Sequence, residues 1–151
     1  MKKILLTLIM LVPALLADAQ GPIKSWNDQL DDFITNFNET DTALGQLYSD
    51  NGISAFIFTY FEPESGNVIK EASVFDDADF EKIDDALMKQ AKDFALGHLS
   101  KAARENARIK SILNEFQKRG TDIVLLYSTP IGDTKATKSV ILTPAEILSQ
   151  Q

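Results

Sequence analysis

The sequence predicts an α+β fold, a two-layer domain in which helices cover one face of a four-stranded antiparallel sheet. Four short segments rich in apolar residues, 53–61, 68–75, 123–128 and 136–142, predict the strands. Longer segments in which apolar residues recur every three or four positions predict the helices. The strands form two pairs joined by short turns. The predicted order is therefore helix, short helix, hairpin, long helix, hairpin and short helix.

The N-terminal part of the fold is predicted to be helical. Apolar residues recur every three or four positions from Trp26 to Phe37, and Ser25 before them is a suitable N-cap. A second, short helix is predicted over residues 42–48, and the turn-forming residues at 50–52 end it.

The first predicted strand, 53–61, is apolar on both faces, which is typical of a central strand covered on both sides. A turn at 63–67 joins it to a more polar strand at 68–75. Two apolar faces require two covers, and a dimer or a bound ligand would supply the second. The two faces consist of Ile53, Ala55, Ile57 and Phe61 on one side and of Phe56, Phe58 and Tyr60 on the other.

The longest helical segment is predicted from Asp76 to about Arg119, where Gly120 ends it. A straight helix of about 40 residues would extend about 60 Å, which is long for a domain of this size. Either the helix bends or breaks near Gly97, which we favour, or it projects and needs a partner. The last segments predict a strand at 123–128, a turn at 130–133, a strand at 136–142 and a short helix after a capping box at 143–146.

The N-terminal residues 1–19 have the layout of a secretory signal peptide. Two lysines precede an apolar run of about 13 residues, too short to span a membrane, and Ala17 and Ala19 form a small-residue cleavage site. We expect a mature chain that starts at Gln20, carries residues 20–151 as one domain, and is periplasmic or secreted. The chain has no Cys, so a lipoprotein anchor is excluded, and no stable membrane anchor is expected after cleavage.

Composition excludes several classes of function. Removing residues 1–19 from the 151-residue chain leaves 132 residues, and it changes the net charge from −7 to −8 because Lys2, Lys3 and Asp18 are lost. Such an acidic chain repels nucleic acids. The absence of Cys excludes disulfides, thiol nucleophiles and thiolate metal sites. No cofactor is expected.

Candidate residues for chemistry are few. His98 is the one histidine of the chain, and no hydrolase signature accompanies it, so we interpret it as a packing or surface residue that could also line an interface. Asp76, Asp77 and Asp79 are weak candidates for a cation site, although their position at a helix start favours capping. Asn38 and Thr42 each lie in a three-residue pattern resembling a glycosylation acceptor.

Candidate binding residues are aromatic or basic. Phe56, Phe58, Tyr60 and Tyr127 lie on predicted strands and could line an apolar pocket, with helix packing as the ordinary alternative. Residues 20–99 carry 5 basic and 16 acidic side chains, whereas residues 100–151 carry 8 and 5. Basic residues such as Arg104 and Arg108 therefore form either a docking face or, as we prefer, a solvated helix surface.

These patterns predict a small exported domain that binds an unidentified ligand or partner without catalysis, as a homodimer or as an assembly or accessory protein of the cell envelope. The alternative is a hydrolase that uses carboxylates, with or without a metal, on envelope polymers or glycans. That alternative requires acidic side chains that converge in a cleft.

Overall fold

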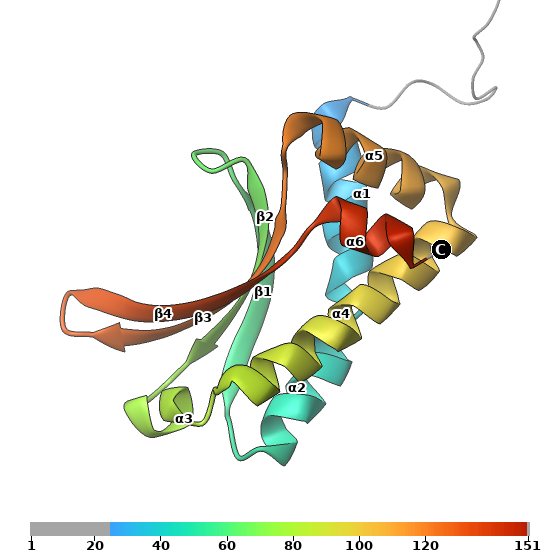
Figure 1. Ribbon diagram of the computed structural model, residues 1–151. Helices are drawn as coiled ribbons and strands as arrows, with labels where there is room; N and C mark the ends of the chain where they lie inside the picture. Colours follow the sequence, from blue (N-terminus) through green and yellow to red (C-terminus); the bar gives the residue numbers. More distant parts are fainter. Residues whose placement is uncertain (1–24, 151) are drawn as a thin grey trace, which may run out of the picture.

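Six helices and four strands form the part of the chain, residues 25–150, that the computed structural model describes (Figure 1). The expected signal peptide lies outside these residues. The helices are α1 (Trp26–Asn38), α2 (Asp41–Asp50), α3 (Asp77–Glu81), α4 (Asp85–Glu105), α5 (Ala107–Arg119) and α6 (Pro144–Ser149). The strands are β1 (Ala55–Glu62), β2 (Asn67–Val74), β3 (Ile123–Ile131) and β4 (Thr134–Leu142). The predicted α+β class and the order of the elements are confirmed.

The four strands form one sheet in the order β1-β2-β3-β4, so the first strand lies at an edge and not at the centre as predicted. Both hairpins are antiparallel as predicted, but β2 and β3 run parallel, with Val68 beside Ile123 and Ser73 beside Ser128. The sheet is therefore mixed, and the prediction of a fully antiparallel sheet is wrong. The cause is the connection through α3, α4 and α5, which returns the chain to the end of the sheet where β2 begins (Figure 1).

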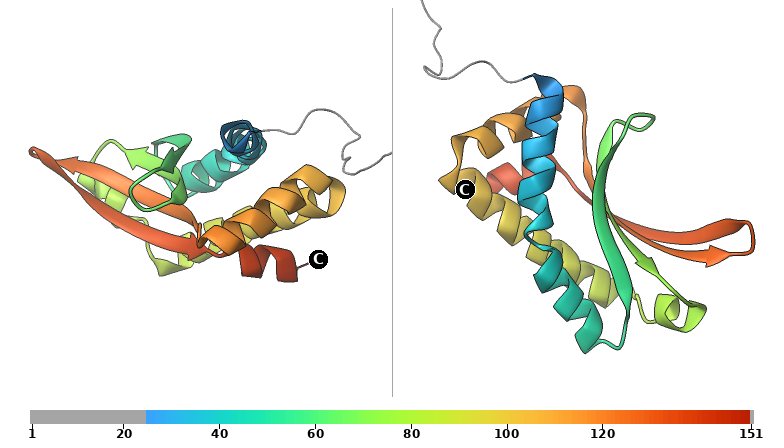
Figure 2. Two further views of the ribbon diagram at one scale, coloured as in Figure 1. Left: turned by 90° about the horizontal axis from the view of Figure 1, so that it is seen from above. Right: turned by 180° about the vertical axis from the view of Figure 1, so that it is seen from behind.

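The helices lie on one side of the sheet, and the β3–β4 hairpin extends away from most of them (Figures 1 and 2). The core forms between this helical layer and the sheet residues that alternate toward it. Its fully buried aromatic side chains come from both layers, namely Phe33, Phe37, Phe116 and Tyr127.

The predicted long helix is broken into three. Asp76 caps α3 and Asp84 caps α4, each accepting a hydrogen bond from a backbone N–H three residues on. The break between α4 and α5 falls at Asn106, so its expected position at Gly97, which lies inside α4, is wrong. Asn106 is extended, and its side chain accepts from the Arg108 N–H, which replaces the helical bonding pattern locally.

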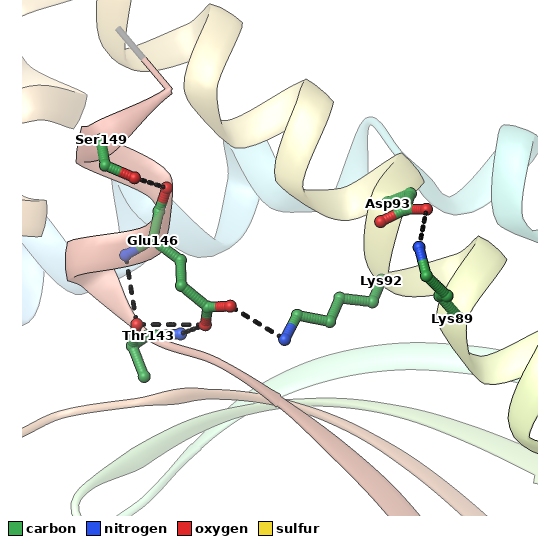
Figure 3. A network of polar contacts seen from close by, with 6 residues as sticks. All are labelled: Lys89, Lys92, Asp93, Thr143, Glu146 and Ser149. Carbon is green, nitrogen blue, oxygen red and sulfur yellow. Dashed lines mark hydrogen bonds and ion pairs between the residues drawn. The ribbon is translucent and has the colours of Figure 1, made fainter.

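The final helix α6 begins with the predicted capping box. The Thr143 hydroxyl accepts from the Glu146 N–H at 3.1 Å, and the Glu146 carboxylate accepts from the Thr143 N–H at 2.9 Å (Figure 3). Lys92 of α4 lies 2.9 Å from the same carboxylate and so joins α6 to α4 (Figure 3). Between residues 25 and 150 no helix combines the length and apolarity that membrane crossing requires.

Candidate functional site

The face of the sheet that points away from the helices is the candidate site, and we call it the open face. Side chains alternate across each strand, and the strand registers align those that point outward into rows across the sheet. No helix lies over this face in either view of Figure 2. Its residues include Phe56, Phe58, Tyr60 and Glu62 on β1, Ile69, Glu71 and Ser73 on β2, Val124, Leu126, Ser128 and Pro130 on β3, and Lys135, Thr137, Ser139 and Ile141 on β4.

Aromatic rings follow one another along the outward side of β1. The ring centroids of Phe56 and Phe58 are 5.4 Å apart, and those of Phe58 and Tyr60 are 5.6 Å apart. Phe56 is 61 % exposed, and Ile141 on the opposite edge strand is also exposed. The open face is thus apolar along β1 and at Ile141, which is the composition of a contact surface.

A single carboxylate lies at the centre of the open face. The Glu71 carboxylate accepts hydrogen bonds from the Tyr60 hydroxyl at 2.8 Å and the Ser128 hydroxyl at 2.7 Å, and Lys135 Nζ donates to it at 3.2 Å. These four residues come from four different strands. The Glu71 side chain is 5 % exposed although no helix covers it, because its neighbours on the sheet enclose it.

The electrostatics of this cluster stabilise the ionised carboxylate. Burial alone would raise the pKa of Glu71, but the hydrogen bonds from Ser128, Tyr60 and Lys135, together with the Lys135 charge, hold it below its ordinary value. Burial, the hydrogen bond to Glu71 and the Glu71 charge raise the pKa of Tyr60 to about 12. At neutral pH the cluster therefore holds one carboxylate that is ionised, paired and hydrogen-bonded.

Three of the four predicted aromatic residues lie together, and the fourth does not. Phe56, Phe58 and Tyr60 form the row on the open face, whereas Tyr127 points into the core on the other face. The Tyr127 hydroxyl lies 3.0 Å from that of Tyr48, and both side chains are buried.

His98 lies on α4, away from the open face. Its Nε2 is 3.1 Å from the Asn36 carbonyl oxygen, so the ring bridges α4 to α1. It also lines a shallow hollow of about 400 Å³, together with the half-exposed Phe94, Gly97 and Lys101 of the same helix and residues of the α1–α2 junction. The position fits a packing residue at the edge of a groove.

The predicted basic face lies next to acidic side chains of the same molecule. Arg104 and Arg108 are exposed on α4 and α5, and α5 packs against α1. Arg108 and Asp32 line the same small hollow between these two helices. At least one residue of the predicted basic face is thus near an acidic residue of the same molecule.

The acidic residues near α3 act as caps and anchors. Asp76 accepts from the Asp79 N–H at 2.8 Å, and Asp79 accepts from the Ser54 N–H at 3.0 Å, while Asp77 is exposed. The backbone hydrogen bond from Ser54 lowers the pKa of Asp79, and the nearby Lys82 adds to this effect. Within residues 25–150 no group of three potential metal ligands comes together.

The two glycosylation patterns differ in accessibility. Thr40, which follows Asn38 by two residues, is buried, and its hydroxyl donates to the Phe37 carbonyl oxygen at 2.7 Å. Thr42 is exposed at the start of α2.

Sequence reasoning did not identify the Glu71 cluster. The one available signal was the adjacent charged pair Lys70–Glu71 in the middle of a predicted strand, since neighbouring residues of a strand point to opposite faces and each charge must find a partner on its own face. Ser128 and Lys135 carry no such signal, because their approach to Glu71 depends on the parallel pairing of β2 with β3.

Searches against known protein families, curated proteins and solved structures gave no match to this chain.

Proposed function

We propose that this chain is an exported, non-catalytic binding domain whose contact surface is the open face of its sheet. The observation that carries the proposal is the row of Phe56, Phe58 and Tyr60 on a sheet face that no helix covers. Covering an aromatic side chain of this kind stabilises a complex by about 2 kcal/mol. Aromatic residues are also enriched among the side chains that contribute most to interfaces.

The Glu71 cluster supports the same proposal. Covering an unpaired charge would oppose binding, but Glu71 already accepts hydrogen bonds from Tyr60, Ser128 and Lys135. These bonds also hold the Tyr60 ring and the Lys135 side chain in place across the sheet. The open face is therefore an ordered surface that can be covered without losing a charge partner.

The alternative of a carboxylate-dependent hydrolase finds less support. A general acid needs a raised pKa, whereas the pKa of Glu71 is lowered and its two oxygens are occupied. Glu71 is better suited to holding the surface than to transferring a proton.

Export follows from the layout of residues 1–19, which we propose are removed before the chain acts outside the cytoplasm. The partner would then be an envelope or extracellular component, or a second copy of the chain.

The experiment is site-specific photo-crosslinking in cells that express the full chain. A benzophenone amino acid replaces Phe56 on the open face or, as the control, Phe94, which is half exposed on α4. We expect a discrete adduct from position 56 and no such adduct from position 94. An absence of adduct at position 56, or equal adducts at both positions, would overturn the proposal.

A further inference from the structure

The strand β1 is one edge of the sheet, with α1 and α2 packed against it. Among the described residues it pairs with β2 on one side and with no strand on the other. Its sequence, AFIFTYFE, is uncharged from Ala55 to Phe61 and contains no Pro. Natural proteins protect edge strands with Lys, Pro or bulges, because a bare edge pairs with other chains.

The opposite edge strand, β4, is more polar. Its sequence, TKATKSVIL, contains two Lys, two Thr and one Ser. Lys135 itself extends over the open face to the Glu71 carboxylate, 3.2 Å away. The two edges of one sheet thus differ, and β1 is the edge suited to pairing.

We propose that the open edge of β1 pairs with β1 of a second copy, antiparallel about a twofold axis at Phe58. This inference rests on the proposed function and names a second copy of the chain as the partner at the β1 edge of the open face. The two sheets would join into one continuous sheet, and the aromatic rows of the two copies would become one patch. Each copy would contribute Phe56, Phe58 and Tyr60 to it.

The register follows from symmetry and from the faces of the strand. A twofold axis makes the residue numbers of every directly opposed pair add up to the same sum. Because directly opposed residues in an antiparallel pair share a face of the sheet, that sum is an even number. A sum of 116 places Phe58 opposite its own copy and Phe56 opposite Tyr60, with residues 55–61 paired on both strands. Aromatic residues directly opposed across strands stabilise the pairing.

The neighbouring registers are less favourable. A sum of 118 sets Phe56 opposite the charged Glu62, and a sum of 114 shortens the paired segment to residues 55–59. At 116, Glu62 lies opposite Ser54, so neither a like-charge contact nor an aromatic–carboxylate contact forms. The register that pairs the most residues without opposing a charge is therefore the one centred on Phe58.

Charge and polarity favour this arrangement over other contacts between two copies. Two acidic chains, each of net charge −8 without residues 1–19, repel at long range, but β1 brings no charge into its paired segment. Stacking two open faces would instead cover the polar half of the face on β4, including Lys135 and Thr137. Because the repulsion is long-range, salt should strengthen the dimer, whereas it would weaken binding to a basic partner.

Sedimentation and native mass spectrometry on the chain purified after expression of the full sequence provide the first test. We expect a monomer–dimer equilibrium at concentrations up to about 100 μM, with tighter association at higher salt. Phe56→Lys should raise the dissociation constant at least tenfold, because it places a Lys on the edge, whereas the control Phe94→Lys should leave it unchanged. Circular dichroism of each variant shows whether the monomer fold is retained.

The register has its own test, because the chain contains no Cys and each variant carries one. Under oxidising conditions Phe58→Cys should form a covalent dimer, because residue 58 lies opposite residue 58 of the second copy. Thr59→Cys should not form one, because residue 59 lies opposite its own copy only in the register with a sum of 118. A wild-type monomer at every concentration, a dimer that Phe56→Lys does not weaken, or crosslinking through Thr59→Cys alone would overturn the inference. If photo-crosslinking at position 56 captures a different protein while the chain stays monomeric, the proposed function stands and this inference fails.

Discussion

The ammonium group of Lys70 lies 2.5 Å from the Asp41 carboxylate and so joins the centre of β2 to the start of α2. Lys70 is 2 % exposed, donates a second hydrogen bond to the Thr59 hydroxyl, and lies over the Phe37 ring at 4.3 Å. Burial lowers the pKa of Lys70, and Asp41 opposes this effect only in part. The buried charge of Lys70, on the helical side of β2, is thus stabilised by its partner Asp41.

Removing Asp41 and removing Lys70 should lower the free energy of unfolding by different amounts. Asp41→Ala leaves a buried ammonium without its counter-ion and should lower the free energy of unfolding by about 3 kcal/mol, whereas Lys70→Met, which preserves volume, should change it by less than about 1 kcal/mol. Urea denaturation at neutral pH measures both. The double variant should recover most of the loss, and equal costs for the two single variants would contradict this account.

The Glu71 cluster should make stability depend on pH in the acid range. The folded pKa of Glu71 lies below its ordinary value of 4.5, so its contribution is complete above pH 4.5 and is lost as the pH falls through the folded pKa. Glu71→Gln should therefore flatten the decline of the unfolding free energy below that pH and cost about 2 kcal/mol at neutral pH. The matched control is the exposed Glu64→Gln, which should change neither quantity.

The three tyrosines of the chain should resist ionisation while it is folded. Burial raises the pKa of Tyr48 strongly, and burial raises those of Tyr60 and Tyr127 to about 12. Raised pKa values stabilise the fold below the unfolded value of 10.0, and this contribution disappears as the pH rises toward the folded values. Tyrosinate absorbance should therefore appear together with the loss of the circular dichroism signal. Tyrosinate forming near pH 10 in a chain that is still folded would contradict the prediction.

The break between α4 and α5 should depend on the Asn106 side chain. Asn106→Ala removes the cap on the Arg108 N–H and should lower the free energy of unfolding by about 1 kcal/mol. Asn114→Ala, at an exposed site inside α5, serves as the control and should not lower stability, because Ala has a higher helix propensity than Asn. Thermal unfolding followed by circular dichroism distinguishes the two variants, and an unchanged stability of Asn106→Ala would contradict the role of the cap.

Signal cleavage should give a mature chain that starts at Gln20. Intact mass spectrometry of the exported protein should match residues 20–151, and Ala19→Arg should accumulate the longer precursor because the cleavage site needs a small residue. A protein that keeps residues 1–19 after export would contradict both the cleavage site and the proposed freedom from a membrane anchor.

Local features of the fold could be predicted because their physical causes are local. The helix start at Ser25, the capping box at Thr143 and both hairpins follow from residues near one another in sequence. Whether the two hairpins meet through parallel or antiparallel strands could not be predicted, because this depends on the end of the sheet to which the intervening helices return the chain. The break at Asn106 was missed because glycine is the stronger helix breaker by propensity, whereas here an Asn cap decides the position.

The candidate site was accessible from the sequence only in its apolar part. Alternation along β1 separated Phe56, Phe58 and Tyr60 from the core side of the strand, and it predicted a surface in need of a second cover. The grouping of Tyr127 with them is wrong, because Tyr127 points into the core. Alternation separates the two faces of one strand, but it does not show which residues of a distant strand lie on the same face of the sheet. The partners of Glu71 depend on the same tertiary information.

The parallel pairing of β2 with β3 also constrains the order of folding. Each hairpin can form from local contacts, but the β2–β3 ladder joins segments separated by three helices, so it carries a large loop-closure entropy. The helices reduce that entropy by shortening the connection, and the complete sheet should form after them. Until that step, β1 and β2 are exposed as an isolated apolar hairpin, and during this interval the chain is most vulnerable to aggregation.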